Sequence, residues 1–255
     1  MSSTQNSPSR DIILVRQVAL AATFTALVFL ATSLFYLALV ASSGFFNLGE
    51  AFVYLAALIG GPIVGAVAGG LGSAMADAFL GYGTFVPATL VLKGLEGFVA
   101  GLLYQYGKEG DPRLRRIILI GVTGFVILFS VYVTTPVLNG VPESVNVQGS
   151  FVFGDTEFPF SFPGLVLVII SIILSTIIWW IEFRLGSKGQ MAVACIIAGP
   201  IIIVGYFLYE IMFLSIAPEA ALSEVPFNIA QVVFGTLIAV PIVAYLKELG
   251  IIREP

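Results

Sequence analysis

Residues 49–80, GEAFVYLAALIGGPIVGAVAGGLGSAMADAFL, decide how this chain folds. The stretch contains only two charged side chains, Glu50 and Asp77, and it is longer than the ~20 apolar residues that one helix needs to cross a bilayer. Gly60-Gly61-Pro62 stands at its middle, and a proline after two glycines interrupts a helix. The stretch is therefore either one kinked helix or two helices joined by a tight turn.

The composition of the whole chain is that of an integral membrane protein. Of its 255 residues, 58% are hydrophobic and 10% are charged, and the mean hydropathy is +1.05. Soluble domains carry about 25% charged residues, so these values exclude a disordered chain and a nucleic-acid-binding protein and argue against a soluble enzyme. With no histidine and one cysteine, Cys195, the chain has almost no material for a metal or nucleophile site, and we expect no cofactor.

The placement of Lys and Arg decides the number of spans. Seven apolar runs cover 12–40, 49–80, 87–106, 115–135, 163–183, 190–215 and 227–248. Splitting the second run at Gly60–Pro62 places the cations outside the spans on one side, as cytoplasmic loops require, and leaves only Lys93 within a span. The sequence therefore predicts an all-α polytopic membrane bundle of eight spans with both termini cytoplasmic.

Two local patterns have a structural and a functional interpretation. Small residues recur every four positions at Gly61, Gly65, Gly69 and Ser73, and a related series on the first helix comprises Ala19, Ala22 and Ala26. Such series allow helices to approach closely, either within the bundle or against another membrane subunit. In the long outer loop 137–162, alternating residues on both sides of Gly154-Asp155 predict a β-hairpin, either a lid over an outward mouth or a hairpin resting on the membrane surface.

Polar residues within the spans are the candidates for a binding site, because such side chains are costly in lipid. The predicted topology brings all of them to the outer half of the bilayer: Asn47, Glu50, Asp77, Lys93, Glu96, Tyr206, Glu210, Asn228 and Gln231. A channel would need polar lining along its whole length, so this distribution indicates a pocket open to the outside and closed below. The excess of carboxyl groups favours a ligand that is not strongly anionic.

The same outer half contains aromatic candidates, and its polar residues also have a structural interpretation. Tyr54, Tyr82, Phe85 and Tyr206 lie near the outer end and would stack on a ring. Structural roles are the alternative for the polar residues: Lys93 would pair with Glu96 or with Asp77, and Asn47 and Asn228 would cap helices.

Six short motifs, in order, resemble the S components of energy-coupling factor (ECF) transporters, most closely the riboflavin-type branch. They are Asn47-Leu48-Gly49-Glu50, Gly60-Gly61-Pro62, Gly72-Ser73-Ala74-Met75-Ala76-Asp77, Leu92-Lys93-Gly94-Leu95-Glu96-Gly97, Gly205-Tyr206-Phe207-Leu208-Tyr209-Glu210 and Pro226-Phe227-Asn228-Ile229-Ala230-Gln231. The resemblance covers 12–107 and 190–248. It implies a six-helix core that binds a vitamin from outside, a transmembrane coupling subunit that contacts Ala22 and Ala26, and two cytoplasmic ATPase subunits.

The same resemblance divides the chain into parts. A cytoplasmic tail (1–11) precedes core helices 1–4 (12–108), an inserted transmembrane hairpin (109–189) follows, and core helices 5–6 (190–248) lead to a second tail (249–255). The expected function is substrate capture for an ECF-type ABC importer in a prokaryotic plasma membrane, with lipid as surroundings and no nucleic acid. The chain has no GxxxxGK[ST] phosphate loop, which fits a subunit that takes its energy from partners.

Three other functions stay open at this point. A stand-alone ion-coupled secondary transporter also needs no ATPase, although the sequence shows no clear inverted repeat. An intramembrane enzyme would use Glu50, Asp77 and Glu96 as catalytic carboxylates, but no protease motif accompanies them. An assembly subunit would bind no ligand at all.

Overall fold

The computed structural model describes residues 10–39, 45–107, 146–153, 156–163 and 187–252, together with isolated positions between 117 and 180. The helices are α1 (Arg10–Leu34), α2 (Gly49–Gly60), α3 (Pro62–Leu80), α4 (Val86–Gly107), α7 (Ser187–Ala198), α8 (Pro200–Met212) and α9 (Pro218–Glu248). The strands are β1 (Tyr36–Leu39), β2 (Phe45–Asn47), β3 (Asn146–Phe153) and β4 (Thr156–Pro163). The expected inserted spans, 115–135 and 163–183, lie largely outside the described residues.

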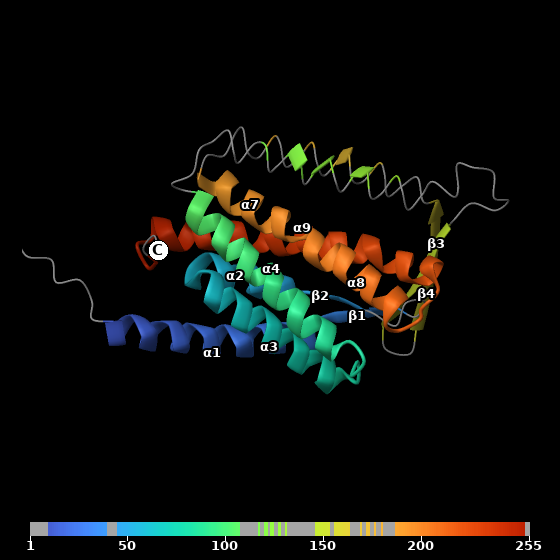
Figure 1. Cartoon of the computed structure of the whole chain (residues 1–255), viewed down its shortest axis with the longest axis horizontal. Helices are drawn as coiled ribbons and strands as arrows, with labels where there is room; N and C mark the ends of the chain where they lie inside the picture. Colours follow the sequence, from blue (N-terminus) through green and yellow to red (C-terminus); the bar gives the residue numbers. More distant parts are fainter. Residues whose placement is uncertain are drawn as a thin grey trace, which may run out of the picture.

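The described helices form a bundle of membrane-spanning length. Five segments are long and apolar enough to cross a bilayer: Asp11–Leu34, Pro62–Leu80, Val86–Gly107, Gly189–Met212 and Ala220–Glu248. The helices run lengthwise beside one another, and the strands lie toward the end opposite the C-terminus (Figure 1). The class expected from the sequence, an all-α polytopic membrane protein, is confirmed at this level, while eight spans and the side of the termini stay predictions.

The break within 49–80 separates two helices. Gly61 has φ +83°, a left-handed conformation that favours glycine, and Pro62 opens α3. The 12 residues of α2 rise about 18 Å at about 1.5 Å per residue, less than the ~30 Å hydrocarbon thickness. The polar start of α2 can therefore lie inside the bundle instead of at the membrane surface.

A four-stranded antiparallel sheet lies at the end of the bundle where α2 begins (Figure 1). Its order is β2-β1-β3-β4, so the hairpin β3–β4 adds to the pair β1–β2. The β-hairpin expected in 137–162 is confirmed, with Phe151 opposite Phe158. The run 12–40 is not one helix as expected: α1 ends at Leu34 and the apolar residues after it form β1, because they pair with β2 and β3.

The last two spans differ from their expected limits. The expected span 190–215 consists of α7 and α8, which meet at Gly199 before Pro200. The expected span 227–248 is too short, since α9 begins at Pro218 and continues through Pro226. Asn228 therefore lies inside a helix and does not cap one.

Glycines bring α3 and α4 into close contact in the half of the bundle away from the sheet. A Cβ on Gly65 would lie 2.5 Å from the carbonyl oxygen of Gly97, and one on Gly69 would lie 2.6 Å from that of Lys93. Gly65 and Gly69 of the small-residue series thus serve packing inside the bundle. Ala22 and Ala26 on α1 are exposed instead.

A candidate ligand-binding site

Polar and aromatic side chains enclose a cavity between the sheet end of the bundle and its apolar core. Its empty space is about 410 Å³, counting the part open to solvent. The lining comprises Thr32, Phe45, Asn47, Ser73, Asp77, Tyr82, Phe85, Thr89, Lys93, Tyr206, Glu224, Asn228 and Gln231. These residues come from α1, β2, α3, the α3–α4 connection, α4, α8 and α9, so the cavity exists only when segments far apart in the sequence assemble.

Helical periodicity supplies much of this lining. Ser73 and Asp77 are four residues apart on α3, and Thr89 and Lys93 are four apart on α4. Side chains at i and i+4 share one face of a helix, so each helix presents one polar stripe to the cavity. The opposite helix faces are apolar.

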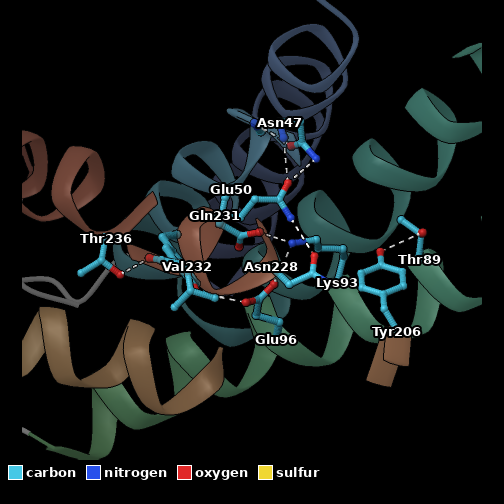
Figure 2. Close-up of polar contacts among 12 residues, drawn as sticks. Asn47, Glu50, Thr89, Lys93, Glu96, Tyr206, Asn228, Gln231, Val232 and Thr236 are labelled. Carbon is cyan, nitrogen blue, oxygen red and sulfur yellow. Dashed lines mark hydrogen bonds and ion pairs between the residues drawn. The ribbon is translucent and has the colours of Figure 1, made fainter. Parts of the chain in front are cut away.

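Ion pairs close the cavity on the side of the core. The amine of Lys93 contacts Glu50 Oε2 and lies 3.2 Å from Glu96 Oε2. The hydroxyl of Tyr54 donates to Glu96 Oε1 at 2.9 Å. Figure 2 shows the amine of Lys93 between the two carboxyls. All four side chains are buried, so this floor is an ion network screened from water.

Amide groups join the sheet to α9 on another wall. The backbone N and the Nδ2 of Asn47 both donate to Gln231 Oε1, at 2.8 and 2.7 Å. Gln231 Nε2 donates to Asn228 Oδ1 at 3.1 Å, and the nitrogen of Gly49 donates to Asn47 Oδ1 at 2.9 Å (Figure 2). Asn47 thus supports the first turn of α2 while it also lines the cavity, so its structural and its site role coexist.

Aromatic rings border the cavity near the sheet. The ring centroids of Phe45 and Tyr82 are 4.7 Å apart. Tyr206 lies 6.4 Å from Phe85 between ring centroids and donates its hydroxyl to Thr89 Oγ1 at 2.8 Å. Burial, and then the neighbouring Tyr36 phenol and the carboxyls of Asp77 and Glu224, raise the pKa of the Tyr82 phenol above its ordinary value of 10, so this hydroxyl stays protonated and able to donate at neutral pH.

The structure brings together most of the side chains that the sequence selected. Among the nine expected site residues, the cavity is lined by Asn47, Asp77, Lys93, Tyr206, Asn228 and Gln231. Glu50 and Glu96 lie one layer deeper, as partners of Lys93. Glu210 is fully buried beside Glu224 but does not line the cavity. Of the expected aromatic side chains, Tyr54 lies below the floor.

Sequence reasoning missed Thr32, Phe45, Ser73, Thr89 and Glu224. Glu224 precedes the expected span 227–248, whereas α9 begins at Pro218 and includes it. Its spacing of four to Asn228 and seven to Gln231 is the signal that could have found it, since the three share one face of α9. Phe45 had no such signal, because its position depends on the pairing of β2 with β1.

Comparisons with known proteins identify the family of this chain. A protein of Pyrococcus woesei described as "Uncharacterized protein in gap 3'region" is 39% identical over 94 residues, which are 37% of this chain and 60% of that relative, so the match spans less than two thirds of its length. No solved structure matches the chain. The model of the family "ECF-type riboflavin transporter, S component" matches residues 13–150, more than half of the sequence. The chain therefore belongs to the ECF-type riboflavin transporter S components, multi-pass cell-membrane proteins of vitamin uptake, which are not an enzyme family.

Proposed function

We propose that this protein is the substrate-binding subunit of an ECF-type importer, and that it captures a vitamin or related micronutrient in the cavity between Asn47, Asp77, Lys93 and Gln231. The observation that carries the proposal is the polar and aromatic cavity near one end of a membrane bundle. Ligand-binding sites usually combine apolar or aromatic walls with a few polar groups that point into the cavity. Transport by this mode needs a transmembrane coupling subunit and two cytoplasmic ATPases.

The proposal includes an orientation in the membrane. Arg16 lies near the start of α1 and Lys247 near the end of α9, and both helix ends lie away from the sheet (Figure 1). Positively charged residues favour the cytoplasmic side, so the sheet and the cavity face outward. Eight spans with both termini inside complete this arrangement.

Ligand release inward requires movement of the whole subunit in this proposal. Below Lys93 and its two carboxyl partners, the core contains Val53, Tyr54 and Leu58, all with at most 1% exposure. Apolar packing of this kind closes the described helices below the cavity, whereas a channel would need polar lining along its whole length. We infer that the loaded subunit reorients within its complex.

The first helix offers the surface for the coupling subunit. Ala19, Ala22 and Ala26 are exposed on α1 and follow one face of that helix. Small side chains let the backbone of a partner helix approach closely. We propose Ala22 and Ala26 as the contact.

Mass spectrometry of the chain purified from its membrane, without added ligand, tests the binding function. We expect one vitamin-class compound to copurify at about one molecule per chain. A chain that carries no small molecule and gains no thermal stability from any vitamin would favour an assembly subunit instead.

Reconstitution of the lone chain in liposomes separates the importer from its main alternative. We expect no uptake with sodium or proton gradients, and uptake only after ATP and the coupling and ATPase subunits are supplied. Accumulation driven by an ion gradient through this chain alone would show a secondary transporter.

A further inference from the structure

Three amide side chains form a hydrogen-bonded chain along one wall of the cavity. Asn47 of β2 contacts Gln231 of α9, and Gln231 contacts Asn228 one turn earlier on the same helix (Figure 2). All three line the cavity and are at most 8% exposed. An amide has an oxygen that accepts and a nitrogen that donates, so the orientation of each amide decides what a ligand meets.

Backbone N–H groups fix the first two orientations. The nitrogen of Gly49 donates to Asn47 Oδ1 at 2.9 Å, and Asn47 Nδ2 donates to Gln231 Oε1 at 2.7 Å. The backbone nitrogen of Asn47 donates to the same Gln231 oxygen at 2.8 Å. A backbone N–H can only donate, so these contacts are lost if either amide turns over. Both lone pairs of Gln231 Oε1 are thus used within the protein.

The orientation of Asn228 follows from that of Gln231. Because its oxygen is held by Asn47, Gln231 directs Nε2 to Asn228 Oδ1 at 3.1 Å. The other end of the Asn228 amide, Nδ2, has no hydrogen-bond partner among the described residues, and it is not one of the unpaired side-chain atoms that are shut off from solvent. Since Asn228 lines the cavity, this nitrogen is a donor that a ligand can reach.

Reversal of the Asn228 amide is unfavourable. It would place Nδ2 against Gln231 Nε2, so two donors would face each other at residues that are 4% and 2% exposed. A buried donor without a partner costs more free energy than an ordinary hydrogen bond contributes. This point of the wall therefore suits a ligand atom that accepts, such as a carbonyl oxygen or a ring nitrogen, and disfavours a group that can only donate.

We propose that Asn228 recognises a hydrogen-bond acceptor on the ligand, and that Asn47 and Gln231 are positioning residues that keep Asn228 turned for this contact. The inference rests on the proposed function and specifies the ligand chemistry of the α9 wall. It gives Gln231 a role other than direct ligand binding, since Gln231 acts through Asn228.

Titration calorimetry on the full chain in lipid nanodiscs tests the inference with neutral probes. Riboflavin, the vitamin that the family description names, is compared with analogues that each lose or weaken one ring acceptor. The analogues are 1-deazariboflavin, 5-deazariboflavin, 2-thioriboflavin and 4-thioriboflavin. We expect one of them to bind about three- to tenfold more weakly than riboflavin, the size of one hydrogen bond.

Two substitutions separate recognition from positioning. Asn228→Asp keeps the oxygen that accepts from Gln231 but replaces the Nδ2 donor with an acceptor. Gln231→Glu leaves Asn228 in place and removes the donor that orients it, so the Asn228 amide turns its nitrogen toward the new carboxylate. In both variants, the affinity of riboflavin relative to that of the weaker analogue should fall close to one. Gln17→Glu makes the same amide-to-carboxylate change on the exposed part of α1 and should leave this ratio unchanged.

Because each ratio is measured within one variant, a general loss of stability does not change it. If Gln231→Glu binds too weakly to measure, Gln231→Met removes the orienting donor without adding charge, and the same fall is expected. A ratio retained in the Gln231 variants overturns the positioning role, and equal binding of riboflavin and every analogue overturns acceptor recognition. Failure of all these probes to bind also overturns the inference, whereas vitamin binding is then decided separately by whether another compound copurifies.

Discussion

The two halves of the bundle use opposite kinds of side chains. Toward the sheet, α3, α4 and α9 place Asp77, Lys93 and Gln231 around a cavity. Toward the other end, α3 and α4 meet through glycines, with Gly65 against Gly97, and Cys195 of α7 is fully buried as a small hydrophobe. Each long helix therefore carries a binding half and a packing half.

The contrast between the two halves shows how a membrane protein can contain a polar site. In lipid, helices gain little from the hydrophobic effect between them and associate through close packing. The glycine contacts between α3 and α4 fix the helices, and this leaves room for buried polar groups at the other end. Lys93 lies at the boundary, since its side chain closes the cavity while its carbonyl oxygen packs against Gly69.

Lys93→Met should have the largest effect, and it tests whether the binding half of the bundle also stabilises the fold. Removing the cation leaves Glu50 and Glu96 facing each other, and loss of one partner of a buried ion pair costs roughly 3–5 kcal/mol. We expect a large fall in the thermal unfolding midpoint in detergent. The double variant Lys93→Met/Glu50→Gln should recover part of it, and Arg16→Met on the exposed face of α1 should change little. An unchanged midpoint in Lys93→Met would show that the ion network carries no stability.

Gly65→Ala tests the packing half of the bundle, where α3 contacts α4. The added Cβ would lie 2.5 Å from the carbonyl oxygen of Gly97, so α3 and α4 must separate. Overpacking of this kind costs about 1–3 kcal/mol, and we expect a lower unfolding midpoint with ligand binding by the cavity retained. Gly107→Ala at the end of α4, where a Cβ meets open space, is the matched control. Equal midpoints for the two variants would contradict the role of the α3–α4 contact.

Ala22→Leu should have the smallest effect on the isolated chain. Ala22 is exposed, and surface changes of this kind stay within about 0.5 kcal/mol. We expect normal stability and ligand binding but weaker copurification with the coupling subunit. Ala78→Leu makes the same change at an exposed position of α3 and should not affect assembly. Loss of assembly in both variants, or in neither, would remove α1 as the specific contact.

Much of the architecture follows from the sequence because hydropathy and glycine–proline punctuation act locally. The break at Gly61-Pro62, the limits of α4 and the β-hairpin at β3–β4 were all predictable in this way. The end of α1 at Leu34 was not, because apolar residues suit a helix and a strand equally and only pairing with β2 and β3 decides between them. The start of α9 was not predicted either, since the expected span began at residue 227 and the helix begins at Pro218.

The candidate site divides in the same way. Polar side chains within membrane spans are costly and therefore mark candidate functional sites, and this rule selected Asp77, Lys93 and Gln231 from the sequence alone. The same rule could not tell that Glu210 lies beside Glu224 and outside the cavity lining. It also left open the partner of Lys93, which proved to be Glu50 of α2 as well as the expected Glu96.

By itself, the sequence determined a membrane bundle with its costly polar residues gathered toward one end, because the length, hydropathy and charge of each segment are properties of that segment alone. Only the tertiary structure decided which of these residues face one cavity and which neutralise each other beneath it. Those outcomes depend on the rotation of each helix about its axis and on contacts such as Asn47 with Gln231, 184 positions apart in the chain, and local sequence encodes neither.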